Sequence, residues 1–168
     1  MSMPSGYVRC HGCDFEGVMQ RRPITLEYVL PGGAVVQGYR VFSWCSSCEN
    51  VTEAEEAFDT DSIQAEIDSL RQQQVGFIGR LFGGGKAEDV EIKRLRGRLQ
   101  LAQLRQSGPR CLRCGETTVV PLAFDESGTS SIVHTCGRRL FMVPEDPDAP
   151  RFMFRPEAIR LDPEGWKI

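Results

Sequence analysis

The stretch SIVHTCGRRLF, residues 131–141, holds the one cysteine of the chain that has no close cysteine neighbour. The other six form three pairs with two residues between the partners, in CHGC (10–13), CSSC (45–48) and CLRC (111–114). Two thiolates at this spacing can bind one zinc ion from a single tight turn. His134 lies two residues before Cys136, so both side chains would point to the same face of a strand. We therefore predict that His134 and Cys136 form the fourth ligand pair.

The composition limits the class of fold. The chain has 168 residues, a net charge of −3, 17 glycines and 10 prolines, which indicates many turns in one domain or a few small modules. Small modules with thin apolar cores usually need metal ions or disulfides. We expect no signal peptide and no membrane span, because the longest apolar run, residues 119–124, is far shorter than the roughly 20 residues of a span. The expected location is the reducing cytoplasm, where paired cysteines are more often metal ligands than disulfides.

The segments between the pairs predict which pairs meet. Residues 24–30 and 34–42 have the pattern of two strands around a PGG turn. A hairpin of this length would return the chain to its starting point. We therefore predict a first zinc site made by Cys10, Cys13, Cys45 and Cys48.

The second half of the chain repeats this plan. Residues 117–124 and 131–136 have the pattern of strands around a turn at residues 125–130. The predicted second zinc site consists of Cys111, Cys114, His134 and Cys136. Both zinc ions are expected to be structural, because four protein ligands leave no open position for water or substrate.

Two other chemistries fit the cysteine pairs less well. A thioredoxin-type CxxC pair begins a helix after a strand, and three pairs separated by hairpin-like sequence fit metal binding better. A zinc-dependent deaminase would need a glutamate two residues after its histidine, where Cys136 stands. The sequence also lacks HExxH, GxSxG and phosphate-loop motifs. We expect that the protein is not an enzyme.

The cysteine-containing segments resemble a known family. CHGCDFEG with WCSSCEN, and CLRCGE with HTCG, resemble the knuckles of zinc ribbons over residues 7–50 and 109–143. The resemblance implies structural zinc held between two knuckles on a short antiparallel sheet. Zinc ribbons serve many functions, so it indicates a fold more than a role.

The segment between the cysteine pairs favours helices. Residues 61–74 and 87–106 carry apolar side chains at helical spacing, and residues 51–58 are also rich in helix formers. The two longer stretches would form an antiparallel hairpin with a glycine-rich tip. Its apolar side chains are Phe77, Ile78, Leu81 and Phe82.

Together these patterns predict a small, metal-stabilised α+β fold, in which an antiparallel helical hairpin bridges two zinc-ribbon β modules. The expected order of domains is a first ribbon (1–50), the hairpin (51–108), a second ribbon (109–145) and a proline-rich, acidic tail (146–168).

Two surfaces of the hairpin are candidates for binding a partner. The apolar side chains of the tip must be shielded from water. Either they pack onto the chain's own ribbon, or they bind a protein partner, a second copy of the chain or a membrane surface. The alternative is nucleic-acid binding by the basic residues Lys93, Arg94, Arg96 and Arg98. These charges wrap around the apolar stripe of the helix instead of forming one face. We therefore predict a non-enzymatic adaptor that binds a protein or itself.

Overall fold

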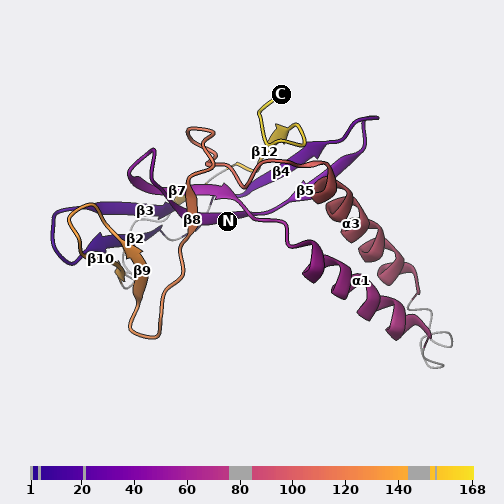
Figure 1. Ribbon diagram of the computed structural model, residues 1–168, viewed down its shortest axis with the longest axis horizontal. Helices are drawn as coiled ribbons and strands as arrows, with labels where there is room; N and C mark the ends of the chain where they lie inside the picture. Colours follow the sequence, from indigo (N-terminus) through magenta and orange to yellow (C-terminus); the bar gives the residue numbers. More distant parts are fainter. Residues whose placement is uncertain (1, 4, 21, 76–84, 144–151, 154) are drawn as a thin grey trace. The chain divides into compact units, whose positions relative to one another are not determined.

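The computed structural model describes residues 2–3, 5–20, 22–75, 85–143, 152–153 and 155–168 (Figure 1). These residues form twelve strands and two helices. They divide into two compact units. Unit 1 comprises Met1–Thr25, Tyr39–Glu56 and Pro109–Ile159. Unit 2 comprises Leu26–Gly38, Ala57–Gly108 and Arg160–Ile168. Each unit is assembled from three stretches of chain, so neither coincides with one of the consecutive segments expected from the sequence.

Unit 1 contains three antiparallel sheets. The first has the order β3-β2-β10-β9, with β2 (Ser5–Cys10), β3 (Glu16–Gln20), β9 (Thr129–Val133) and β10 (Arg139–Val143). The second has the order β7-β6-β8, with β6 (Arg40–Cys45), β7 (Asn50–Glu55) and β8 (Val119–Pro121). The third pairs β1 (Ser2–Met3) with β11 (Phe152–Met153).

The two larger sheets of unit 1 share one core. Its buried members are Val8, Cys10, Trp44, Val51, Ile132 and Leu140, with Phe15, Met19, Leu122 and Phe124 packed against them. The ring of Phe15 meets that of Trp44 edge-on at 5.5 Å between centroids. Because the core takes side chains from both sheets, burial of apolar area stabilises them together.

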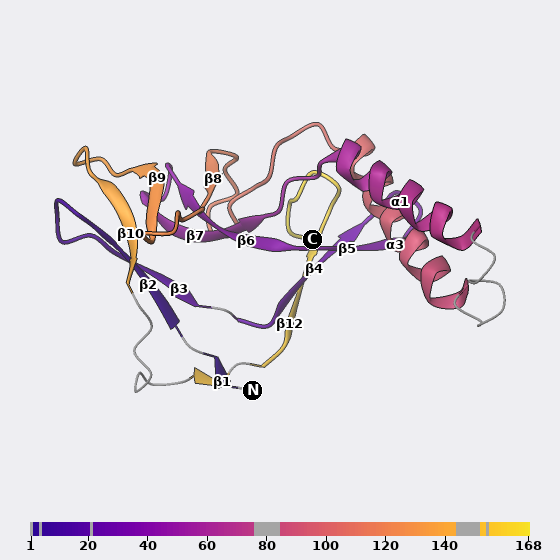
Figure 2. The same ribbon diagram turned by 90° about the horizontal axis from the view of Figure 1, so that it is seen from below.

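Unit 2 contains the two helices and part of a sheet. The sheet has the order β12-β4-β5, with β4 (Ile24–Val29), β5 (Val35–Gly38) and β12 (Glu157–Leu161). Residues 24–25 of β4 and 157–159 of β12 belong to unit 1. The helices α1 (Thr60–Val75) and α3 (Gly85–Leu104) lie side by side (Figure 1, Figure 2). Their contact is the apolar cluster of Ile63, Ile67, Ile92 and Leu95. Asp59 caps α1, since its carboxylate accepts hydrogen bonds from the N–H groups of Asp61 and Ser62.

The predicted fold class is wrong. The described residues are mostly β, and no helical hairpin bridges two ribbon modules: all eight predicted metal ligands lie in unit 1, and both helices lie in unit 2. Residues 51–55, which favoured a helix in the sequence, belong to β7 and pair with β6 along its whole length. Six consecutive pairs with a neighbouring strand outweigh the weak helix propensity of this stretch.

The predicted local hairpins account for only part of the strand pairing. β4 does pair with β5, in the register Tyr28↔Val36. The returning strand stops at Gly38, however, and β6 begins two residues later in the sheet with β7 and β8. Of the second predicted hairpin, the turn and one isolated antiparallel bridge, Phe124↔Ser130, are present. Its strands pair elsewhere, because β8 pairs with β6 and β9 pairs with β10. Pairing between distant strands therefore decides where the cysteines meet.

Residues 76–84 contain the predicted apolar tip, so Phe77, Ile78, Leu81 and Phe82 lie outside the described residues. Neither described helix is long and apolar enough to cross a membrane. In the predicted C-terminal tail, β12 joins β4, and the N–H of Trp166 donates to the carboxylate of Asp162 at 2.9 Å.

Candidate metal centres

The eight predicted ligands form two groups, each with four ligand atoms within 4.8 Å of one another. Site 1 consists of Cys10, Cys13, His134 and Cys136. Site 2 consists of Cys45, Cys48, Cys111 and Cys114. The predicted ligands are brought together, but the predicted pairing is wrong: the first pair of the chain meets the fourth, and the second meets the third. The sites are nested in the sequence, because both ligand pairs of site 2 lie between the first and the second ligand pair of site 1.

Strand pairing explains the composition of site 1. Cys10 ends β2 and pairs with Leu140 of β10, and the N–H of His11 donates to the carbonyl of Arg139 at 3.2 Å. The turn between β9 and β10 carries His134 and Cys136, and it is closed by a 2.8 Å bond from the N–H of His134 to the carbonyl of Arg138. Pairing of β2 with β10 thus brings the turn after β2, which carries Cys13, next to the turn that carries His134 and Cys136.

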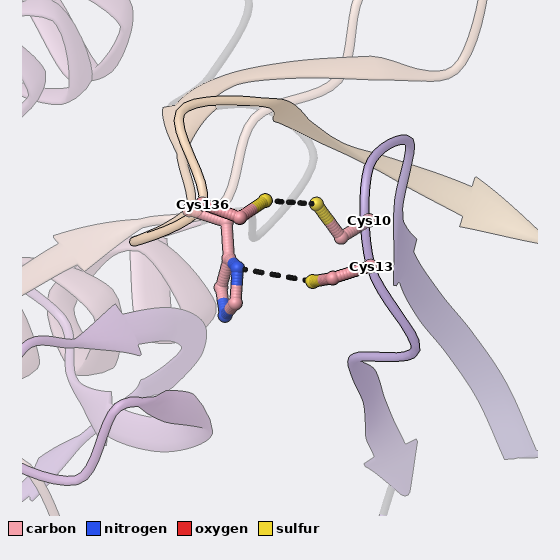
Figure 3. A group of neighbouring side chains, drawn as sticks. Cys10, Cys13 and Cys136 are labelled. Atoms are coloured by element: carbon pink, nitrogen blue, oxygen red, sulfur yellow. Dashed lines mark hydrogen bonds between the residues drawn. The ribbon is translucent and has the colours of Figure 1, made fainter.

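The ligand atoms of site 1 face one another (Figure 3). The Sγ atoms of Cys10 and Cys136 are 3.2 Å apart, and Sγ of Cys13 lies 3.4 Å from Nδ1 of His134. Sulfur atoms bound tetrahedrally at about 2.3 Å would lie about 3.8 Å apart, so a small expansion admits an ion. The N–H of Gly12 also points at Sγ of Cys10 from 3.4 Å. The site therefore has the donor set of a four-coordinate metal.

The imidazole of His134 is held by the core of unit 1. Its ring lies 4.7 Å from that of Phe15 and 5.6 Å from that of Trp44, between centroids. Trp44 directly precedes Cys45, which is a ligand of site 2. Trp44 therefore contacts a ligand of site 1 with its ring and is the chain neighbour of a ligand of site 2.

Site 2 is formed where three strands meet. Cys45 ends β6, Cys48 lies in the turn to β7, and Cys111 forms an isolated bridge with Ala54 of β7. The sulfur of Cys45 is 3.6 Å from that of Cys114, and the sulfur of Cys48 is 3.9 Å from that of Cys111. These separations match a tetrahedral ion without adjustment.

A hydroxyl group supports site 2 from inside the protein. Thr52 is buried, and its Oγ1 lies 3.3 Å from Sγ of Cys111. Burial raises the pKa of Cys111, but hydrogen bonds from Thr52 and from the N–H groups of Cys114 and Arg113 outweigh it and lower that pKa to about 7. Burial raises the pKa values of Cys45 and Cys48. Binding of a cation to the remaining thiols must therefore release protons.

The sequence did not identify Thr52, because residues 51–55 favoured a helix. With these residues taken as a strand, alternation places Thr52 two positions from Ala54, on the side that meets Cys111. The same strand carries Glu55, which is buried and whose carboxylate accepts a 2.6 Å bond from the N–H of Arg110. The N–H of Glu55 donates in turn to the carbonyl of Arg110 at 3.0 Å. These bonds join the chain on either side of residues 57–108, directly beside site 2.

Of the four predicted basic residues of α3, two contact neighbouring side chains and two are exposed. Arg94 donates to the carboxylate of Glu91 at 3.0 Å, and the guanidinium of Arg98 lies 5.9 Å from the ring centre of Phe58. Lys93 and Arg96 are exposed. The four residues therefore do not form one surface of equivalent charges.

When compared with models of known protein families, with curated proteins and with solved structures, the chain matches none of them.

Proposed function

We propose that the protein binds two structural zinc ions, which stabilise unit 1, and that the remaining chain binds a protein partner. The observation that carries this proposal is the nesting of the two four-ligand groups. Seven thiols and one imidazole are soft and borderline donors, and zinc prefers them in a closed tetrahedron. With every position taken by protein, each ion would stabilise the fold and have no direct part in catalysis.

Elemental analysis and native mass spectrometry test the metal. We expect two zinc ions per chain after purification without added metal. Iron also binds four cysteines, and it would reveal itself by visible absorbance. A chain with iron, or with one ion only, would contradict the proposal.

The role as an adaptor rests on the helical segment. Two hydrogen bonds between Glu55 and Arg110, one between backbone groups and one to the Glu55 carboxylate, fix the chain at both ends of residues 57–108. Within that segment the sequence places four large apolar side chains, Phe77, Ile78, Leu81 and Phe82. We propose that this apolar sequence binds a protein or a second copy of the chain.

The test compares two double variants of the full chain. Phe77→Ser with Phe82→Ser should abolish self-association or retention of a partner, and this binding should depend weakly on salt. Lys93→Glu with Arg96→Glu is the matched control, because both side chains are exposed and their replacement leaves the contacts of Arg94 and Arg98 in place. Salt-sensitive binding of mixed DNA or RNA that is lost only in the charge variant would favour the nucleic-acid alternative.

A further inference from the structure

The two sites differ in how their sulfur atoms meet solvent. Site 1 has two exposed thiols, Cys13 and Cys136, and Sγ of Cys136 lies 3.2 Å from that of buried Cys10 (Figure 3). Site 2 has one exposed thiol, Cys114, whose nearest recorded sulfur is 3.6 Å away on the fully buried Cys45. Susceptibility to oxidation follows exposure and thiolate character. Site 1 therefore combines access for an oxidant with a second sulfur close at hand.

We propose that site 1 is an oxidation site, at which a hydroperoxide links Cys10 to Cys136 and releases the metal ion while site 2 keeps its own. The proposal rests on zinc binding as proposed above. It assigns to site 1 a reversible chemical modification in addition to its structural role.

The reaction balances with a peroxide as the oxidant. The thiolate of Cys136 attacks one peroxide oxygen, the O–O bond breaks, and a sulfenic acid and hydroxide form. The thiolate of Cys10 then attacks the sulfur of Cys136, and the S–O bond breaks with loss of a second hydroxide. Two thiolates thus lose two electrons, and hydrogen peroxide with two protons becomes two molecules of water. With Cys10 and Cys136 joined, only Cys13 and His134 would remain to hold the ion, which would then be released.

Backbone pairing holds the segments that carry Cys10 and Cys136 together independently of their sulfur atoms. Pairing of Leu140 with Cys10, and the bond from His11 to Arg139, already hold the two turns together. The two sulfur atoms are 3.2 Å apart without an ion and would lie about 3.8 Å apart around one, and they must approach to the disulfide length of about 2.05 Å. β2 and β10 would remain paired after the metal leaves, so a reductant and zinc would restore the site.

Release of the ion can be followed through Trp44, whose ring lies 5.6 Å from that of His134. Trp166 is the second tryptophan of the chain and lies in unit 2, so Trp166→Phe leaves Trp44 as the single reporter. A change of Trp44 emission together with the first ion released would locate that ion at site 1.

The experiment treats the zinc-loaded full chain with increasing amounts of hydrogen peroxide. Released zinc is measured with a chromogenic chelator, and disulfides are mapped by non-reducing peptide mass spectrometry. We expect one of the two ions to leave first, the first disulfide to join Cys10 with Cys136, and dithiothreitol with zinc to reverse both changes. Release of both ions together, or a first disulfide within site 2 or between Cys10 and Cys13, would overturn the proposal.

Matched variants and the starting metal content separate this proposal from the proposed function. Cys136→Ser should abolish the first phase of release, whereas Cys114→Ser, which replaces the exposed thiol of site 2, should keep the Cys10–Cys136 disulfide. If a variant folds poorly, the first disulfide mapped in the wild-type chain still decides whether the proposal holds. A chain with fewer than two zinc ions before oxidation contradicts the proposed function instead, and its first disulfide still decides whether site 1 is the oxidation site.

Discussion

Sites 1 and 2 have similar donors but different surroundings. In site 2 two of the four ligands, Cys45 and Cys111, are almost completely buried, and a buried hydroxyl faces one of them. In site 1 Cys10 alone is buried, and the imidazole of His134 replaces a fourth thiolate. An ion enclosed by protein, with hydrogen bonds to its ligands, is held more firmly than an exposed one. We therefore expect site 2 to contribute more to stability and site 1 to react more readily.

The nesting of the sites adds an order of closure. Site 2 joins residues 63 positions apart, and site 1 joins residues 121 positions apart. If site 2 closes first, the flexible loop that site 1 must then close is shorter. Loop-closure entropy therefore favours this order. The effect is small, because each doubling of loop length costs only about 0.6 kcal/mol. The difference between the sites must then come mainly from burial and hydrogen bonding.

The largest effect is expected from removing the buried ligand at the end of β6. Cys45→Ser should reduce the zinc content to one ion or less and destabilise unit 1 by an amount comparable with the whole stability of a domain, about 5–15 kcal/mol. Cys10→Ser, at the equivalent place in site 1, should cost less and leave site 2 occupied. Urea unfolding and metal analysis measure both variants. A larger loss in Cys10→Ser would reverse the ranking of the sites.

The next effect concerns the imidazole. His134→Ala should weaken zinc binding at site 1 by more than about 100-fold, because loss of a mere outer hydrogen-bond partner already costs about 10–100-fold. Site 2 should keep its ion, because its four ligands are cysteines and do not include His134. Competition with a chelator gives both affinities. His134→Cys is the control that retains four ligands, and unchanged affinity in His134→Ala would show that the imidazole is not a ligand.

All eight ligands of these sites could be identified from the sequence, because CxxC spacing and a His–Cys pair at strand spacing are local signals. Their partners could not, because they depend on which strands pair. The end of β5 at Gly38 illustrates this: a Cβ at that position would lie 2.3 Å from the ring of Tyr28, so the chain passes close to an aromatic side chain there. The strand carrying Cys45 then starts anew in another sheet. There it pairs with β8, far along the chain, and such a pairing between distant strands leaves no periodic pattern.

A smaller effect should come from the hydroxyl beside site 2. Thr52→Val keeps the shape of the side chain but removes its hydrogen bond to Sγ of Cys111, so zinc should dissociate about 10–100 times faster from site 2. Site 1 should be unaffected. Thr52→Ser retains the hydroxyl and is the matched control. The rate of zinc transfer to a chelator measures dissociation from each site. Equal rates in Thr52→Val and the wild type would show that the Thr52 hydroxyl does not stabilise zinc at site 2.

The smallest effect should lie in the turn that leads to site 1. The carboxylate of Asp125 accepts bonds from the N–H groups of Ser127 and Thr129 at 2.9 and 3.0 Å, at the start of β9. Hydrogen bonds from the Ser127 hydroxyl and these N–H groups lower the pKa of Asp125 below its ordinary value of 3.8. A carboxylate with a lowered folded pKa stabilises the fold fully above the unfolded value, and this stabilisation is lost as the pH falls through the folded value.

Asp125→Asn should therefore accelerate zinc loss from site 1 slightly and by the same factor from pH 6 to pH 8, where the carboxylate is fully ionised. Zinc loss from site 2 should keep the wild-type rate, because Asp125 lies in the segment that leads to His134 and none of its recorded hydrogen bonds reaches a ligand of site 2. Chelator kinetics at three pH values provide the measurement. An effect that varied between pH 6 and pH 8, or one that appeared at site 2, would mean that the turn does not act through the ionised Asp125 on site 1 alone.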